Sequence, residues 1–533
     1  MTSRLGLVAG PTLGFLVALG ALACSAMGGN HDEMAAPGDP SGGWGADTGT
    51  GYSPPSDSAP SSADGAPADA GSGSYGSVGV GGGQDFAAFR KALDEGRVPA
   101  PSTLDATGFF AEHYTSLPTP TCGKTFCLHG MLSVSADLVR GGDWTLLQMA
   151  MNSPIDPSTV KKPHLDLAVV LDHSGSMAGA GKLDFAKLGV KQLIEGLDPE
   201  DTFTLIAFDD RIDTLFGPAN PTDKTKLKSI VDGIVSRGNT DIYAALETGY
   251  QKVIAAGGEQ LQRRVIFLTD GVPTAGIKNL TSIKEMSAKY NDKYVGLTTI
   301  GLGGDVDAKF LRGLAEQGSG NFYFIEKPEA VADVFKEELA FFVAPIAYDL
   351  DLTFTELPDF SLKTVYGTNL WKATAGGGSV HVPSVFLVSR TSTAPGPSGG
   401  RRGGGAAIIA ELGPKGSPLA GMHDVAKVDM RYRVPGSADF ETQTVTVTFD
   451  GTPGKAPDGG YYQTKSVEKN TVILSIFVAF RDATEKAQTD KPAALKILED
   501  FKPLITKRLE GWADEDLVDD LKILDQYITV LKK

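Results

Sequence analysis

The sequence lacks several patterns that would point to a common enzyme, a nucleic-acid-binding protein or a membrane span. It contains no H-E-x-x-H motif of the metalloproteases. Lys and Arg number 49 against 65 Asp and Glu, and the formal net charge of −16 argues against nucleic acid and against peripheral binding to anionic lipid. The apolar stretch 472–480 is too short to cross a bilayer.

Cysteine is also scarce, with three in 533 residues. Cys122 and Cys127 are close in sequence, so in an oxidising compartment they could close a small loop by a disulfide. A zinc site is the alternative, but His129 is single and no second pair of Cys or His ligands completes it. We therefore predict a disulfide between Cys122 and Cys127, which leaves Cys24 unpaired.

The first 24 residues have the pattern of an export signal. Arg4 provides a minimal positive region, an apolar segment runs to Ala23, and Cys24 follows small residues. This pattern resembles a bacterial lipoprotein signal, in which the cysteine is lipidated and becomes the mature N-terminus. The resemblance implies lipidation of Cys24 and an exported protein held at a membrane of the bacterial cell envelope. Plain cleavage after Ala23 and an uncleaved anchor are the alternatives.

Residues 25–84 contain Gly, Ser, Pro, Ala and Asp with few large apolar residues, which predicts a flexible tether. An N-terminal extension follows at residues 85–160. Helical spacing of its apolar residues predicts one helix ending near Gly96 and a second over 107–114. Alternation over 131–149 predicts a pair of strands.

Residues 161–345 alternate between apolar, strand-like runs and helical stretches. Strands are expected at 164–171, 203–208, 265–269, 297–300 and 322–325. Helices are expected at 184–196, 227–235, 241–255, 283–291, 309–317 and 328–342. Alternation of this kind predicts an α/β fold with a doubly wound, mostly parallel sheet that carries helices on both faces.

Three short segments of this region offer oxygen ligands. Asp172, Ser174 and Ser176 follow the first strand, Thr240 precedes a helix, and Asp270 follows another strand. Because ligand sites of open parallel sheets lie at the carboxyl ends of the strands, we expect these side chains to converge. Hydroxyl and carboxylate donors without Cys or His are the ligands of a hard divalent cation such as Mg²⁺.

The D-x-S-x-S segment, the later Thr and the strand ending in Thr-Asp-Gly together resemble the metal-ion-dependent adhesion site of a von Willebrand factor type A (VWA) domain. The resemblance covers roughly residues 164–345 and implies a Rossmann-like VWA fold. It implies hydroxyl ligands from Ser174, Ser176 and Thr240, with negative charge from Asp172 and Asp270, partly through water. Mg²⁺ is the expected ion, with Mn²⁺ and Ca²⁺ as alternatives. The upstream helices and strands add a resemblance to bacterial exported VWA-domain lipoproteins.

Each segment alone has a simpler explanation. Ser and Asp commonly form turns and helix caps, and both Thr240-Asp241 and Asp270-Gly271 fit such roles. The stretch 179–182 suggests a phosphate loop, but Leu183 stands where Ser or Thr is needed. The order of the three segments favours the metal site.

The pattern changes after Pro345. Alternation with period two at 349–354, 379–388, 427–434 and 444–449 predicts a β-sandwich-like region over 346–465. Residues 466–533 carry leucine and isoleucine at helical spacing, which predicts C-terminal helices that pack against one another.

Two classes of function fit these features. In the one we favour, the protein is not an enzyme, and the ion binds an acidic group of a protein partner in adhesion or envelope assembly. In the other, the ion is the Lewis acid of a metal-assisted hydrolase. A hydrolase needs a general base, and His173 occupies the variable position of D-x-S-x-S, where its side chain should point away from the ion.

Overall fold

The computed structural model describes residues 76–84, 86–161, 163–256, 262–304, 306–325, 334–335, 344–388, 407–415, 421–452, 455–457 and 459–533. Cys24, most of the predicted tether, the Gly-rich segment 396–405 and nearly all of the predicted helix 328–342 lie outside these residues.

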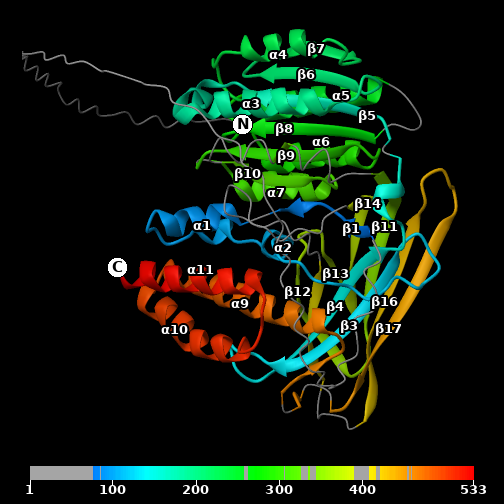
Figure 1. The fold of residues 1–533 in the computed structure, drawn as a ribbon, viewed down its shortest axis with the longest axis vertical. Helices are drawn as coiled ribbons and strands as arrows, with labels where there is room; N and C mark the ends of the chain where they lie inside the picture. The colour runs from blue at the N-terminus through cyan, green and yellow to red at the C-terminus, as the bar shows by residue number, and fades with distance from the viewer. Residues whose placement is uncertain are drawn as a thin grey trace, which may run out of the picture. The chain divides into compact units, whose positions relative to one another are not determined.

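The first large element is a seven-stranded sheet with the order β2-β10-β9-β8-β5-β6-β7 (Figure 1). Its strands are β2 (Gly82–Gly83), β5 (Leu165–Asp172), β6 (Thr202–Phe208), β7 (Ile212–Ala219), β8 (Gln262–Thr269), β9 (Gly296–Leu302) and β10 (Asn321–Ile325). All neighbours are parallel except β6 and β7. The predicted mostly parallel sheet is thus confirmed, whereas the edge strand β7 was not predicted.

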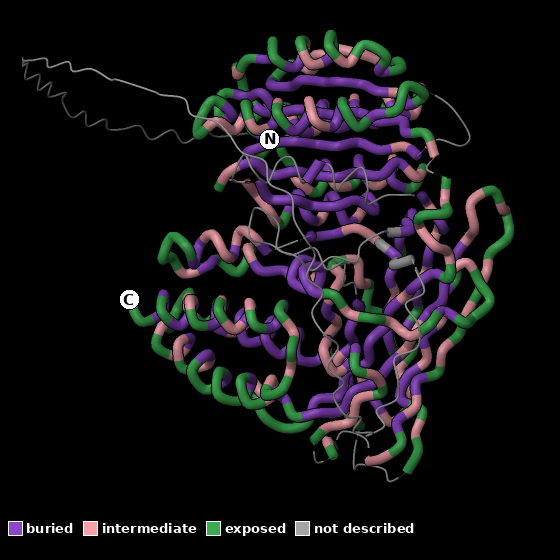
Figure 2. Tube along the Cα trace, in the orientation of Figure 1, coloured by how far each residue is buried: buried purple, intermediate pink, exposed green. Residues whose placement is uncertain are grey.

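Helices cover both faces of this sheet. They are α3 (Lys182–Gly196), α4 (Lys224–Asp232), α5 (Ile242–Ala255), α6 (Leu280–Asn291) and α7 (Ala308–Gln317). Alternate residues of β5 face opposite sides, so Leu167 and Val169 pack with α3 and α4, while Ala168 and Val170 pack with α5, α6 and α7. Because both faces are covered, every residue of β5 is buried, and its centre, residues 167–171, is a continuous apolar run (Figure 2).

The second large element is an antiparallel sheet of eleven strands. The strands are β1 (Gly76–Gly79), β3 (Cys127–Ala136), β4 (Asp143–Ser153), β11 (Ala344–Glu356), β12 (Phe360–Tyr366), β13 (Lys372–Thr374), β14 (Gly377–Val388), β15 (Ile408–Pro414), β16 (Met422–Arg433), β17 (Phe440–Asp450) and β18 (Tyr461–Tyr462). The sheet curls around an apolar core. Gln443 of β17 therefore reaches the start of β3, where its side chain accepts from the Leu128 amide at 3.1 Å. It also donates to the carbonyl of Phe126, the residue before β3, at 2.7 Å.

This sheet joins segments that the sequence analysis treats as separate. The hairpin of β3 and β4 belongs to the extension 85–160, yet β4 pairs with β15 from the region 346–465. Strands β12 and β15 were not predicted from the sequence.

The predicted tether is also too long at its end, because residues 76–79 and 82–83 are the strands β1 and β2. Strand β1 pairs with β4 and β14, and β2 pairs with β10, so backbone pairing orders a segment that has few large side chains.

The described chain contains the Cys122–Cys127 disulfide, which joins the preceding loop to the first residue of β3, with the two Cα atoms 5.6 Å apart. Three short 3₁₀ helices complete the connections: η1 (Pro101–Thr103), η2 (Pro157–Thr159) and η3 (Gly175–Gly181).

A helical layer contains α1 (Ala87–Asp94), α2 (Ala106–Ala111), α9 (Lys465–Ala487), α10 (Lys491–Arg508) and α11 (Glu515–Lys532). Helix α2 is thus shorter than the predicted 107–114. The helices share one apolar core with Trp144 and Leu146 of β4, and the apolar stretch 472–480 of α9 lies inside it. Phe89 of α1 stacks on Phe480, with ring centroids 5.5 Å apart. Among the described helices, none has the length and hydropathy of a membrane span.

A buried ion pair connects the N-terminal extension to the last helix. His113 Nε2 lies 2.8 Å from Asp520 Oδ2, and His113 Nδ1 lies 2.8 Å from the Phe109 carbonyl oxygen. Both side chains are nearly inaccessible to solvent. Burial by itself lowers the pKa of His113, but the carboxylates of Asp520 and Asp516 and the carbonyl outweigh it, so the pKa is raised above its ordinary value of 6.5.

We expect this pair to make the stability of the fold depend on pH. Because the folded-state pKa of His113 is raised, its stabilisation is complete below about pH 6.5 and is lost as the pH rises through the folded-state pKa. The variant His113→Gln should lose ~3 kcal/mol of unfolding free energy at pH 6, since Asp520 is left without its partner, and less at pH 9. Thermal and urea unfolding at both pH values measures this difference.

His381→Gln is the matched control, because His381 also pairs with an aspartate, Asp351, but is 42% exposed. Equal losses for His113→Gln at pH 6 and pH 9 would contradict the expectation.

Candidate metal centre

The pairing of β5 with β8 places two acidic strand ends side by side. Leu171 is opposite Leu268 in the parallel register, so Asp172 and Thr269 end the two strands at the same level. Thr269 Oγ1 donates a hydrogen bond to Asp172 Oδ2 at 2.6 Å. Asp172 and the following Asp270 are 0% and 1% exposed, respectively. The sheet therefore brings together two carboxylates that are 98 positions apart in the chain.

The loop after β5 directs two hydroxyls toward these carboxylates. The Ser174 amide donates to Asp172 Oδ1 at 2.8 Å, which turns the chain sharply at the strand end. The hydroxyl oxygens of Ser174 and Ser176 lie 3.1 Å apart, and Ser176 Oγ donates to Asp270 Oδ1 at 2.8 Å. Ser174 precedes η3, but its side chain makes no capping hydrogen bond to that helix. A helix cap thus does not explain the position of the Ser174 hydroxyl.

The loop that carries Thr240 lies directly against this segment. The Gly175 amide donates to the Gly238 carbonyl at 3.1 Å. Gly238 has a φ of +68°, and a Cβ there would approach Asp209 Oδ2 to 2.8 Å, so the turn requires glycine. On its other side the Thr240 amide donates to Thr274 Oγ1 at 2.9 Å. Thr240 is therefore held between the loops that follow β5 and β8.

The neighbouring Asp241 acts as a helix cap. Its side chain accepts from the Ala244 amide at the start of α5. The capping role considered for Thr240-Asp241 thus belongs to Asp241 and not to Thr240.

The electrostatics of the site favour a cation. Burial raises the pKa of Asp172 to about 6, against the hydrogen bonds from Thr269 and Ser174 that lower it, and the nearby Asp270 raises it further. Two neighbouring buried carboxylates repel each other, and a positive charge beside them relieves that repulsion. Lys182 at the start of α3 supplies one such charge, with its Nζ 2.8 Å from Asp270 Oδ2.

The distances between the candidate ligand oxygens are those of hydrogen bonds, and they are also compatible with adjacent ligands of a small octahedral ion. Mg²⁺ binds oxygen at roughly 2.1 Å, so adjacent ligands of an octahedron lie about 3.0 Å apart. The Ser174 and Ser176 hydroxyl oxygens lie 3.1 Å apart, and Ser176 Oγ lies 2.8 Å from Asp270 Oδ1. No cluster of three or more His, Cys, Asp or Glu suited to a metal occurs in the described part of the chain.

His173 does not face the carboxylates as a base would. Its Nδ1 lies 2.7 Å from the Val235 carbonyl oxygen, and its Nε2 is buried without a hydrogen bond to any described residue. The expectation that this side chain points away thus agrees with the geometry.

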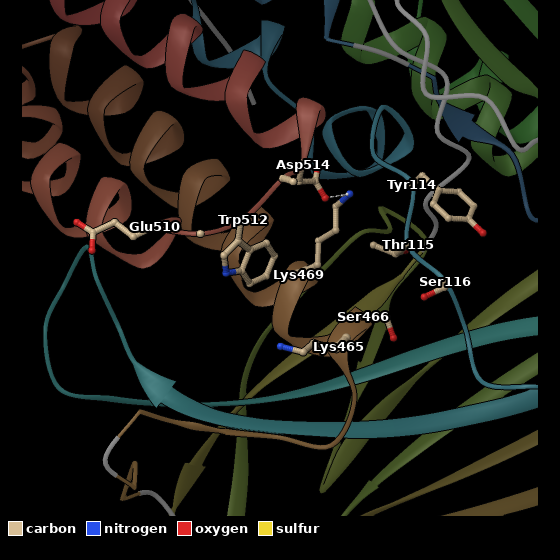
Figure 3. A pocket seen from close by; sticks show the side chains of 11 residues that line it. Tyr114, Thr115, Ser116, Lys465, Ser466, Lys469, Glu510, Trp512 and Asp514 are labelled. Carbon is tan, nitrogen blue, oxygen red and sulfur yellow. Dashed lines mark ion pairs between the residues drawn. The ribbon is translucent and has the colours of Figure 1, made fainter. Parts of the chain in front are cut away.

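A separate pocket of about 570 Å³ lies among residues 114–116, the start of α9 and the loop before α11 (Figure 3). Within it Lys469 extends to Asp514, with Nζ and Oδ2 2.6 Å apart. The residues that line this pocket include no histidine and none of the candidate metal ligands.

Comparison with known proteins identifies the α/β region. Residues 166–337 match the family model of the von Willebrand factor type A domain. These residues form a VWA domain. The VWA domain thus contains all five predicted ligands.

Two curated relatives match parts of the chain. YfbK of Escherichia coli (strain K12), itself uncharacterized, is 26% identical over 199 residues, which cover 37% of this chain and 34% of that protein. Inter-alpha-trypsin inhibitor heavy chain H4 of Bos taurus is 31% identical over 176 residues, covering 32% of this chain and 19% of that protein. The chain therefore spans about a third or less of these relatives.

One solved structure resembles a larger part of the chain. The von Willebrand factor type A protein from Catenulispora acidiphila has a TM-score of 0.51 at 12% identity and covers 75% of this chain and 89% of that one. At this identity the likeness concerns the fold, and it extends beyond the VWA domain.

Sequence reasoning did not single out two of the site's side chains, Thr269 and Lys182. The Thr-Asp-Gly ending of β8 was a signal for Thr269, since it directly precedes Asp270. Lys182 had been weighed only as part of a phosphate loop, and its pairing with Asp270 depends on how α3 packs on the sheet.

We expect Asp172→Ala to abolish Mg²⁺ binding while the fold survives. The Asp172 carboxylate accepts a hydrogen bond from the Ser174 amide and so holds the loop in place. Its negative charge also offsets the cost of removing water from Mg²⁺, which neutral hydroxyls cannot do. Calorimetric titration with Mg²⁺ and circular dichroism measure the two effects. Asp184→Ala removes the same charge from the exposed first turn of α3 and should keep the affinity. Equal Mg²⁺ affinity in Asp172→Ala and wild type would show that these loops are only capped turns.

Proposed function

We propose that this protein uses its VWA domain to bind a divalent cation and, through it, an acidic side chain of a protein partner. Asp172, Ser174, Ser176, Thr240 and Asp270 would hold the ion, with Mg²⁺ favoured over Mn²⁺ and Ca²⁺. The hydroxyl pair at 3.1 Å between two buried carboxylates is the observation that carries this proposal. Adhesion or envelope assembly are the processes that such a protein would serve.

The charges of the proposed ligands explain why the ion would accept a further anion. Asp172 accepts from Thr269 and from the Ser174 amide, so both of its oxygens are engaged. The three hydroxyls among the proposed ligands are neutral, and they cancel little of the ion's charge. When bound, the ion supplies an electrophilic position for a carboxylate oxygen, while the protein side chains fix where that position lies.

The surface around the site supports a protein as the partner. Val235, Val272 and Ile277 are 67%, 45% and 46% exposed, and all three lie on the loops that carry or contact the site. Large aliphatic side chains exposed in this way favour a partner that covers them with its own apolar residues. A carboxylate flanked by apolar side chains therefore fits this surface.

We further propose that the protein is held at the bacterial cell envelope by a lipid on Cys24. The small residues before this cysteine and the composition of the residues that follow it support this location.

We expect Thr240→Ala to weaken carboxylate binding more than cation binding. Thr240 lies between two loops, and in our proposal its hydroxyl contacts the ion chiefly once a carboxylate has bound. Acetate serves as the probe, and its binding to the Mn²⁺-loaded protein is followed by water-proton relaxation. Thr248→Ala is the control, because the Thr248 hydroxyl bonds within α5 to the Ala244 carbonyl. Equal acetate affinity in Thr240→Ala and wild type would contradict this role.

We expect Cys24→Ser to move the protein from the detergent phase to the aqueous phase after expression in a bacterium that processes lipoproteins. The serine cannot take the thioether-linked lipid, so the membrane anchor is lost. Phase partitioning and immunoblotting measure the distribution. Ser25→Ala changes a neighbouring hydroxyl and should leave partitioning as in wild type. A detergent-phase Cys24→Ser protein would favour an uncleaved anchor instead.

A further inference from the structure

We propose that Lys182 sets the charge of the candidate metal centre, so that it weakens cation binding but strengthens carboxylate binding to the loaded centre. This inference rests on the proposed function, because it concerns the same ion and the same acidic ligand. Lys182 would act as a specificity-determining residue without being a ligand itself.

The fold gives Lys182 a defined place beside the carboxylates. It begins α3 directly after Gly181, and only 13% of its side chain is exposed. Its Nζ lies 2.8 Å from Asp270 Oδ2. A Cβ on Gly303 would come within 2.7 Å of Lys182 Cε, and Gly303 has a φ of +80° at the end of β9. Glycine at this position leaves room for the aliphatic part of the lysine.

Asp270 connects the ammonium group to the ligand set. Its Oδ2 accepts from Lys182, whereas its Oδ1 accepts from Ser176. The ammonium and a cation held by Ser174 and Ser176 would therefore interact with the same carboxylate. The two positive charges would repel each other, and water would screen them poorly because Asp270 is 1% exposed.

The charge balance gives the lysine two opposite effects. With Lys182, the two carboxylates and one ammonium have a net charge of minus one, which a divalent ion turns to plus one. Without Lys182, the same centre would be neutral when loaded. The lysine thus disfavours the entry of the ion, and it leaves the loaded centre with positive charge for an incoming carboxylate.

Two variants separate the charge of Lys182 from its packing. Lys182→Met keeps the aliphatic part, and Lys182→Gln keeps a donor for Asp270, so at least one of them should retain the fold by circular dichroism. We expect both to bind Mg²⁺ on the order of tenfold more tightly than wild type in calorimetry. We expect both to bind acetate several-fold more weakly when loaded with Mn²⁺, as followed by water-proton relaxation.

Lys187→Met is the matched control. It removes the same charge from the same helix, but Lys187 bonds to the Asp232 carbonyl at the surface. Its Mg²⁺ and acetate affinities should equal those of wild type.

The outcomes distinguish this inference from the proposed function. If wild type binds Mg²⁺ and acetate but the Lys182 variants match it, the role of Lys182 is wrong and the proposed function stands. If only the variants bind Mg²⁺, Lys182 excludes the ion and the proposed function is wrong for the native protein. If none of these proteins binds Mg²⁺, both are wrong. Tighter Mg²⁺ binding together with unchanged or tighter acetate binding would overturn the opposite effects proposed for Lys182.

Discussion

The hydrogen bond from Thr269 to Asp172 ties the ends of β5 and β8 together, and the geometry of the candidate metal centre depends on it. Parallel pairing brings the two strand ends to one level, and the short contact then fixes the orientation of the buried carboxylate. With one oxygen held by Thr269, the other receives the Ser174 amide and turns the loop. That turn also sets the positions of the Ser174 and Ser176 hydroxyls. A single contact between neighbouring strands thus orders four side chains.

The N-terminal segment has a second organising role, because it adds strands to both sheets. Strand β1 pairs with β4 and β14 of the antiparallel sheet, and β2 extends the VWA sheet beside β10. Only backbone hydrogen bonds can make a Gly-rich stretch part of a sheet in this way, since it has few side chains to bury. The region 76–84 thereby links the VWA domain to the antiparallel sheet. The strands of that sheet come from residues before and after the VWA domain in the sequence.

Much of the VWA domain could be predicted from the sequence because its strands are buried on both faces. The centre of β5, residues 167–171, then appears as an unbroken apolar run, and the helices between the strands keep a clear spacing. Strand β7 was missed because it lies at the sheet edge, where none of its residues is fully buried, and has no such run. The tether was extended too far, and β12 and β15 were missed, because long-range pairing decides these strands and the local pattern does not indicate them.

The sequence by itself determined the candidate ligands and their order, because Asp172, Ser174, Ser176, Thr240 and Asp270 stand at the ends of elements that local periodicity locates. Only the tertiary structure decided which groups these ligands contact. The pairing of Lys182 with Asp270 depends on how α3 packs on the sheet, and Thr269 reaches Asp172 only because β8 lies beside β5. Strand order and helix packing are set by burial summed over the whole core, and no short segment contains that information.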